Sequence, residues 1–149
     1  MGFKEDMERR KQQKEARDYF RQNNDQIANT TDLIKVFVMA TLLSTVGGMI
    51  IISINMMSYL FYVLLAYGIA YGVAKFVDKS TTTVKVMAIV GYLIGIYLSI
   101  LFNFTVQMQS IAGVFVIDFG VALVTMLQGN LFSLLSYVIG AACIYFFIQ

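Results

Sequence analysis

Asp118 is the residue whose type and setting most suggest chemistry. It is the one charged residue between Val86 and Gln149, and it lies inside an apolar stretch over 110–127. An ionisable side chain inside a membrane segment typically binds a cation, carries a proton or pairs with a charge on a partner. Alternatively, the stretch is a helix at the membrane interface, where the Asp118 carboxylate reaches headgroup water. The sequence leaves both interpretations open.

Other chemistry has little support in the residue types. The chain has no His, so the commonest general acid–base and metal-ligating side chain is missing. Its single Cys, Cys143, lies in an apolar run, where a thiol usually packs and does not react. No glycine-rich phosphate loop and no pair of a nucleophile with a base occurs. We therefore expect no enzyme activity, no cofactor and no metal site.

The composition indicates a membrane protein. Hydrophobic residues make up 58% of the 149 residues and charged residues 13%, against roughly 45–50% and about 25% in soluble domains. All eleven Lys and Arg lie at or before Lys85. The net charge of +2 is too small and too mixed for nucleic-acid binding. The predicted fold class is all-α, an integral membrane helical bundle with four to five transmembrane helices.

Four apolar runs are each long enough for about 20 residues of helix, the length that crosses ~30 Å of hydrocarbon. The stretch over 110–127 is either a fifth span or a half-embedded helix. A central Asp disfavours insertion by roughly 2.5–3.5 kcal/mol, and Phe, Ile, Val and Leu offset this by about 0.3–0.6 kcal/mol each, so the sum is near balance and leaves both possibilities open. The predicted spans are 33–54, 59–77, 84–104 and 131–148.

Residues 1–30 form a charged segment before the predicted bundle of residues 31–149. The segment is rich in helix formers and predicts a cytoplasmic helix that either contacts anionic lipid or a partner, or is a solvated tail. Basic residues also flank the loop between the second and third spans, so the positive-inside rule places the N-terminus in the cytoplasm. The C-terminus is cytoplasmic with four spans and external with five. The topology-setting residues are Lys75, Lys79 and Lys85.

Small residues recur four positions apart in the predicted spans. In lipid, such rows allow two helix backbones to approach closely, which favours association by dispersion. The rows serve packing within the chain, or one of them, in the second span, is an interface with another chain. The candidate packing residues are Ala40, Ser44, Gly48, Gly68, Gly72, Gly91, Gly95, Ser99 and Gly140.

Two tyrosines lie deep in the second predicted span. The hydroxyls of Tyr67 and Tyr71 each need a hydrogen-bond acceptor if they are buried. Asn103 and Gln107 are the amide side chains that could provide one.

The stretch YGIAYGVAKFVDKSTTTVKVMAIVGYLIGI over 67–96 resembles a pattern in small uncharacterised bacterial polytopic membrane proteins. In these proteins a small-residue helix ends in a basic loop, and a second helix returns with spaced glycines. The ending over 130–145 is similar to their final span. The resemblance implies four spans and one shorter helix, and it implies no activity and no functional residues.

The expected role is non-enzymatic, in a bacterial cytoplasmic membrane. Small-residue faces and a charged N-terminal segment favour an accessory or scaffold subunit, in contact with membrane lipids and with copies of itself or other membrane proteins. One alternative is a small oligomeric channel or transporter with Asp118 as its ion or proton site. Another alternative is a membrane immunity or stress factor.

Overall fold

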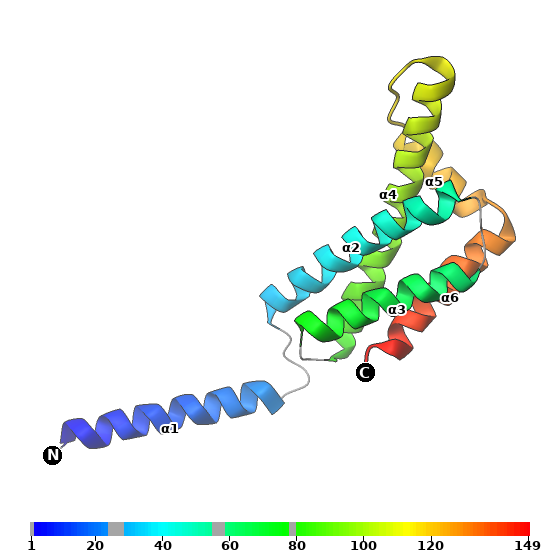
Figure 1. Cartoon of the computed structure of the whole chain (residues 1–149). Helices are drawn as coiled ribbons and strands as arrows, with labels where there is room; N and C mark the ends of the chain where they lie inside the picture. The colour runs from blue at the N-terminus through cyan, green and yellow to red at the C-terminus, as the bar shows by residue number, and fades with distance from the viewer. Residues whose placement is uncertain (1, 24–28, 55–58, 78–79) are drawn as a thin grey trace.

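The computed structural model describes residues 2–23, 29–54, 59–77 and 80–149. The predicted turn over 55–58 and Lys79 lie outside the described residues. All regular structure in the described part is helical, so the predicted all-α class is confirmed (Figure 1). The helices are α1 (Gly2–Asn23), α2 (Thr30–Ser53), α3 (Tyr59–Phe76), α4 (Thr82–Ala112), α5 (Phe119–Gln128) and α6 (Leu131–Phe147).

Several of these helices could span a membrane. In the described part of the chain, α2, α3 and α4 are each long and apolar enough to do so. The pair α5 and α6 meets the same criterion only when taken together, and the two helices are bent by 90° at their break. By length and composition, the described helices therefore allow three crossings, or four if the bent pair forms one span, and they do not include a separate span over 110–127.

The stretch over 110–127 is also not one helix, contrary to the prediction from its sequence. Gly113 ends α4 with a left-handed backbone, φ 66°, and its N–H donates to the Gln109 carbonyl at 3.1 Å. Residues 114–118 are not helical, and Asp118 then caps the N-terminus of α5. A glycine that adopts positive φ stops a helix and an Asp starts one. These two local signals override the apolar periodicity of the stretch.

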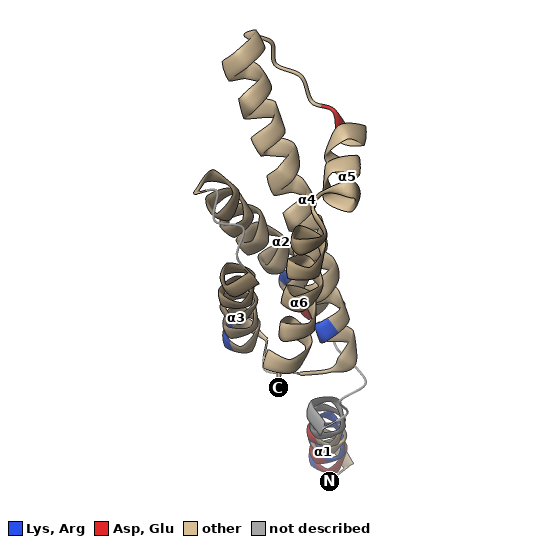
Figure 2. Ribbon diagram, turned by 90° about the vertical axis from the view of Figure 1, so that its right-hand side faces the viewer, with Lys and Arg blue, Asp and Glu red and all other residues tan. Residues whose placement is uncertain are grey.

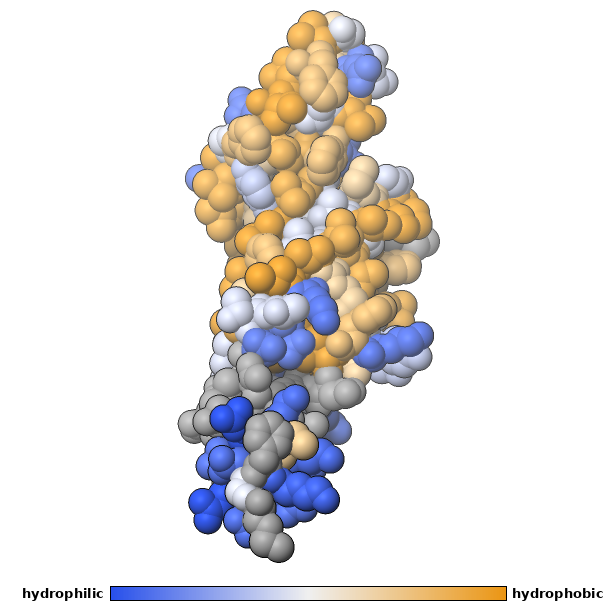
Figure 3. All heavy atoms as spheres, turned by 90° about the vertical axis from the view of Figure 1, so that its left-hand side faces the viewer, coloured by the Kyte–Doolittle hydropathy of each residue, from blue (hydrophilic) through white to orange (hydrophobic). Residues whose placement is uncertain are grey.

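The bundle has one charged end. Figure 1 shows α2 and α4 rising from the end that also holds the C-terminus, while α1 extends away from the bundle there. In Figure 2 the described lysines of the bundle gather at this lower end. Figure 3 shows hydrophilic side chains over α1 and the lower bundle, and mostly hydrophobic ones above. The direction of the helices thus brings the start of α2 and the end of α6 to the basic end of the bundle.

The most extensive helix–helix contact joins α2 and α4. A methyl group at Gly91 would lie 2.9 Å from the Ala40 Cβ and 2.9 Å from the Phe37 carbonyl oxygen. One turn further on, a methyl group at Gly95 would collide with the Ser44 side chain. These glycines are required because the two backbones approach too closely for any side chain between them.

The same register continues for one more turn. A methyl group at Gly48 would lie 2.9 Å from the Ser99 Cβ. The two helices therefore run parallel, with matching small residues at every fourth position of both. The contact places six of the candidate packing residues against one another: Ala40, Ser44 and Gly48 in α2, and Gly91, Gly95 and Ser99 in α4.

The buried hydroxyls of this contact are satisfied by backbone carbonyls. Ser44 Oγ donates to the Ala40 carbonyl of its own helix and lies 3.5 Å from the Gly91 carbonyl of α4. Ser99 Oγ donates to the Ile96 carbonyl at 2.7 Å. Small hydroxyl residues thus fill the contact without leaving an unpaired polar group in an apolar setting.

Replacing Gly95 by Ala tests the close approach. The new methyl group would meet Ser44 and the Thr41 carbonyl, so α2 and α4 must separate. We expect Gly95→Ala to lower the free energy of unfolding by about 1–3 kcal/mol, measured by thermal or denaturant unfolding in detergent.

The matched control is Gly68→Ala in α3, because a methyl group at Gly68 has no neighbour within 4 Å. It should leave stability unchanged or raise it by up to about 1 kcal/mol, since Ala is the better helix former. Equal losses in the two variants would contradict the close α2–α4 contact.

Candidate functional site

An open cleft of about 630 Å³ lies where the bent pair α5 and α6 meets α4. Its apolar walls come from Ile52, Ile100, Phe104 and Phe132. Small-molecule sites in proteins have volumes of about 300–1,000 Å³. Its polar lining combines amide and hydroxyl groups: Asn103 and Gln107 of α4, Thr125 of α5, Asn130 at the break, and Ser133 and Tyr137 of α6.

The two amides of α4 are the distinctive groups of the cleft. Asn103 and Gln107 are one helical turn apart, so both side chains face the same direction. Neither carboxamide has a hydrogen bond to a described residue, whereas the Thr125 hydroxyl already donates to the Val121 carbonyl at 2.8 Å. The cleft therefore offers two carboxamides with free donors and acceptors.

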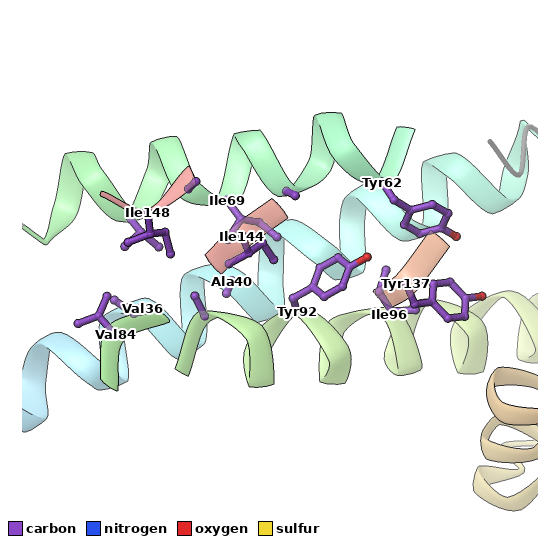
Figure 4. Packing of buried hydrophobic residues seen from close by; sticks show 14 of the residues in the cluster. Val36, Ala40, Tyr62, Ile69, Val84, Tyr92, Ile96, Tyr137, Ile144 and Ile148 are labelled. Atoms are coloured by element: carbon purple, nitrogen blue, oxygen red, sulfur yellow. The ribbon is translucent and has the colours of Figure 1, made fainter. Parts of the chain in front are cut away.

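Three buried phenols lie beside the cleft. Figure 4 shows Tyr62 of α3, Tyr92 of α4 and Tyr137 of α6 close to one another in the core. The Tyr62 and Tyr137 rings meet edge to face, with centroids 5.3 Å apart at 81°, and their hydroxyls are hydrogen-bonded. Since Tyr137 also lines the cleft, this cluster connects its wall to the centre of the bundle.

Tyr92 is the exception within the cluster. Its side chain is fully buried, and its hydroxyl has no hydrogen-bond partner, the one such buried side-chain group in the described part of the chain. A methyl group at Gly140 would collide with this hydroxyl. Gly140, predicted as a packing residue, thus gives the Tyr92 ring its room and brings α6 onto α4.

Asp118 has a local structural role. Its Oδ1 accepts from the Val121 N–H at 3.0 Å, which is an N-cap of α5. A neighbouring bond joins α5 to α4, because the Tyr97 hydroxyl donates to the Phe119 carbonyl at 2.9 Å. Asp118 does not line the cleft. The helix that it caps, α5, lies toward the upper end of the bundle, away from the lysines at the lower end (Figure 2).

The two glycines predicted as an interface in α3 face different surroundings. Gly72 faces α2, since a methyl group there would lie 3.2 Å from the Met39 sulfur. Gly68 faces outward, with nothing within 4 Å of such a group. Tyr67 and Tyr71 are 59% and 63% exposed on the surface of α3.

The described topology-setting lysines lie at the basic end. Lys75 is exposed in the last turn of α3. The Lys85 Nζ lies 4.9 Å from the centre of the Tyr145 ring, a cation–π contact between α4 and α6. This contact fixes the C-terminal turn of α6 beside the first turn of α4.

Sequence reasoning missed the cleft and the phenol cluster. It considered Asn103 and Gln107 only as acceptors for Tyr67 and Tyr71, while the two amides line a cleft formed by α5 and α6. The spacing of Asn103 and Gln107 was a usable signal, because it puts two uncharged polar groups on one face of an apolar helix. The burial of the Tyr92 hydroxyl could not be predicted from the sequence, because it depends on the contact between α4 and α6.

No protein-family model, curated protein or solved structure matches the chain. The resemblance to small bacterial polytopic proteins therefore stays a prediction. In the described residues, no three His, Cys, Asp or Glu side chains come together as a metal-binding group.

Substitutions at Asp118 separate capping from ion or proton binding. Asn caps helices as well as Asp does, so Asp118→Asn should keep the stability of the protein, whereas Asp118→Ala should lose about 0.5–2 kcal/mol. Unfolding in detergent at neutral pH measures both variants. A loss of stability in Asp118→Asn as large as that in Asp118→Ala would show that the charge is needed beyond the cap.

Proposed function

We propose that the protein is a non-enzymatic accessory subunit of an assembly in a bacterial cytoplasmic membrane. Three or four membrane crossings and a wide apolar surface support a membrane location. The positive-inside rule favours a cytoplasmic N-terminus, because the lysines of the bundle lie at the end from which α1 extends. With α5 and α6 as one bent span, the C-terminus lies on the same side.

The outer face of α3 carries this proposal. Tyr67 is the ninth of the 18 residues of α3, so its phenol lies near the middle of a spanning helix. Its ring meets Phe147 edge to face at 5.8 Å, but neither Tyr67 nor Tyr71 has a hydrogen-bonded hydroxyl among the described residues. Hydrocarbon offers no acceptor for these hydroxyls, so leaving them exposed to lipid is unfavourable.

A neighbouring membrane helix would satisfy this face. Gly68 lies between the two tyrosines with open space around it, which permits the close approach on which helix association in lipid depends. The internal small-residue rows of α2 and α4 are already used within the chain. The outward-facing Gly68 of α3 remains open to another chain, a copy of this protein or a different subunit.

The charged helix α1 is a second element available for contacts outside the bundle. It extends from the basic end of the bundle, and its described side chains are exposed (Figure 3). The channel or transporter alternative has less support. Asp118 acts as a cap, and the buried hydroxyls of Ser44, Ser99, Thr105 and Ser136 donate to carbonyls of their own helices.

Gly68→Ile tests the outer face of α3. The position of a Cβ at Gly68 is open, so an Ile there should block close helix approach, abolish assembly and leave the monomer folded. Native mass measurement after mild detergent extraction from the protein's own membranes gives the readout. Wild type should co-purify with at least one further membrane chain, and the variant should not.

The matched control is Ala142→Ile, another small residue exposed on a spanning helix, in α6. It should retain the complex. Gly72→Ile is unsuitable as a control, because Gly72 packs against Met39 and a larger side chain disturbs the fold. An assembly that is the same in wild type and Gly68→Ile would overturn the proposal.

A further inference from the structure

The position of the cleft suggests what reaches it. Asn103 lies 18 residues beyond Lys85 in α4, about 27 Å at 1.5 Å per residue. With Lys85 at one membrane surface, the cleft lies near the opposite edge of ~30 Å of hydrocarbon. This is the depth at which the headgroup of a lipid joins its acyl chains.

The chemistry of the cleft excludes a charged occupant. None of the lining residues is ionisable at neutral pH, and the described lysines of the bundle lie at its other end. A phosphate or an ammonium group would enter without a partner charge, which is strongly unfavourable in a partly buried site. A carboxamide both donates and accepts, and so does an alcohol hydroxyl.

The apolar walls of the cleft provide a second kind of contact for an occupant. Ile100, Phe104 and Phe132 border the amides, so an occupant meets polar and apolar surfaces together. The cleft lies at the break between α5 and α6, where the two helices are bent by 90°. Asn130, at this break, adds a third carboxamide to the lining.

We propose that the cleft formed by α4, α5 and α6 binds an uncharged, hydroxyl-rich group, with the sugar or polyol head of a membrane amphiphile as its main source. Asn103 and Gln107 hydrogen-bond the hydroxyls, and the apolar wall contacts the first part of the attached chain. The same hydroxyl chemistry occurs in a free sugar, which lacks that chain. The proposal does not depend on the role of α3.

The test measures binding of three probes to the full-length protein. The protein is purified in a detergent without a sugar head, and native mass spectrometry follows its occupancy by diglucosyl diacylglycerol, maltose or dioleoylphosphatidylglycerol. We expect the glycolipid to bind and the anionic phospholipid not to compete with it. Tighter binding of the glycolipid than of maltose identifies the lipid as the source, and equal binding identifies the free sugar.

Variants place the binding in the cleft. Asn103→Leu with Gln107→Met removes both carboxamides at nearly unchanged volume and should weaken glycolipid binding roughly tenfold to a hundredfold. Gln109→Met is the matched control, an exposed amide of α4 that does not line the cleft. Circular dichroism and thermal unfolding check that each variant is folded.

Three results would overturn the proposal: no binding of glycolipid or maltose, binding of the phospholipid at least as tight as that of the glycolipid, or equal affinity of wild type and the double variant. If the double variant does not fold, Gln107→Met alone gives the comparison, because Gln107 is exposed in the cleft. This experiment measures ligand binding and not subunit composition, so its result is independent of the assembly test with Gly68→Ile.

Discussion

The close parallel contact between α2 and α4 is the constraint on which the rest of the bundle depends. In lipid the hydrophobic effect does not bring helices together, so dispersion at short distance must do so. Gly91 and Gly95 allow this distance because any side chain there would collide with α2. Because α2 and α4 are parallel, α3, which connects them in the chain, must run in the opposite direction. The lysines at the end of α3 and the start of α4 therefore lie at the same end of the bundle (Figure 2).

The length of α4 determines the rest of the architecture. Its 31 residues extend for about 46 Å, more than the ~30 Å of a hydrocarbon core. The chain ends this helix at Gly113 and returns through residues that are not helical, whose backbone groups need water or other polar partners. It resumes as α5 at the Asp118 cap.

The non-helical segment over 114–118 places α5 beside α4, and α5 is bent by 90° relative to α6. The cleft lies at this bend. The α4–α6 contact through Tyr92 and Gly140 then sets one wall of that cleft.

Composition and periodicity predicted the features that depend on average properties of the chain. The all-α class, the helices near 33–54, 59–77 and 131–148, and the charged segment before them could all be read from runs of residue types. Small-residue spacing indicated which positions permit close packing, but it could not separate Gly68, which faces outward, from Gly72, which faces α2. The division of 110–127 was missed because Gly113 and Asp118 act locally, within a stretch whose average is apolar. The cleft was out of reach, since it depends on the angle between α5 and α6, which no spacing in the sequence encodes.

A double-mutant cycle at Gly48 and Ser99 tests the α2–α4 contact most directly. Within 3.4 Å, a methyl group at Gly48 meets only the Ser99 side chain. Gly48→Ala should therefore destabilise the protein in detergent, and combination with Ser99→Gly should recover more than about 0.5 kcal/mol of that loss relative to additivity. Gly48→Ala combined with Ser136→Gly, at a buried serine of α6, should be additive. Additive losses for Gly48 and Ser99 would contradict the close parallel contact and the architecture built on it.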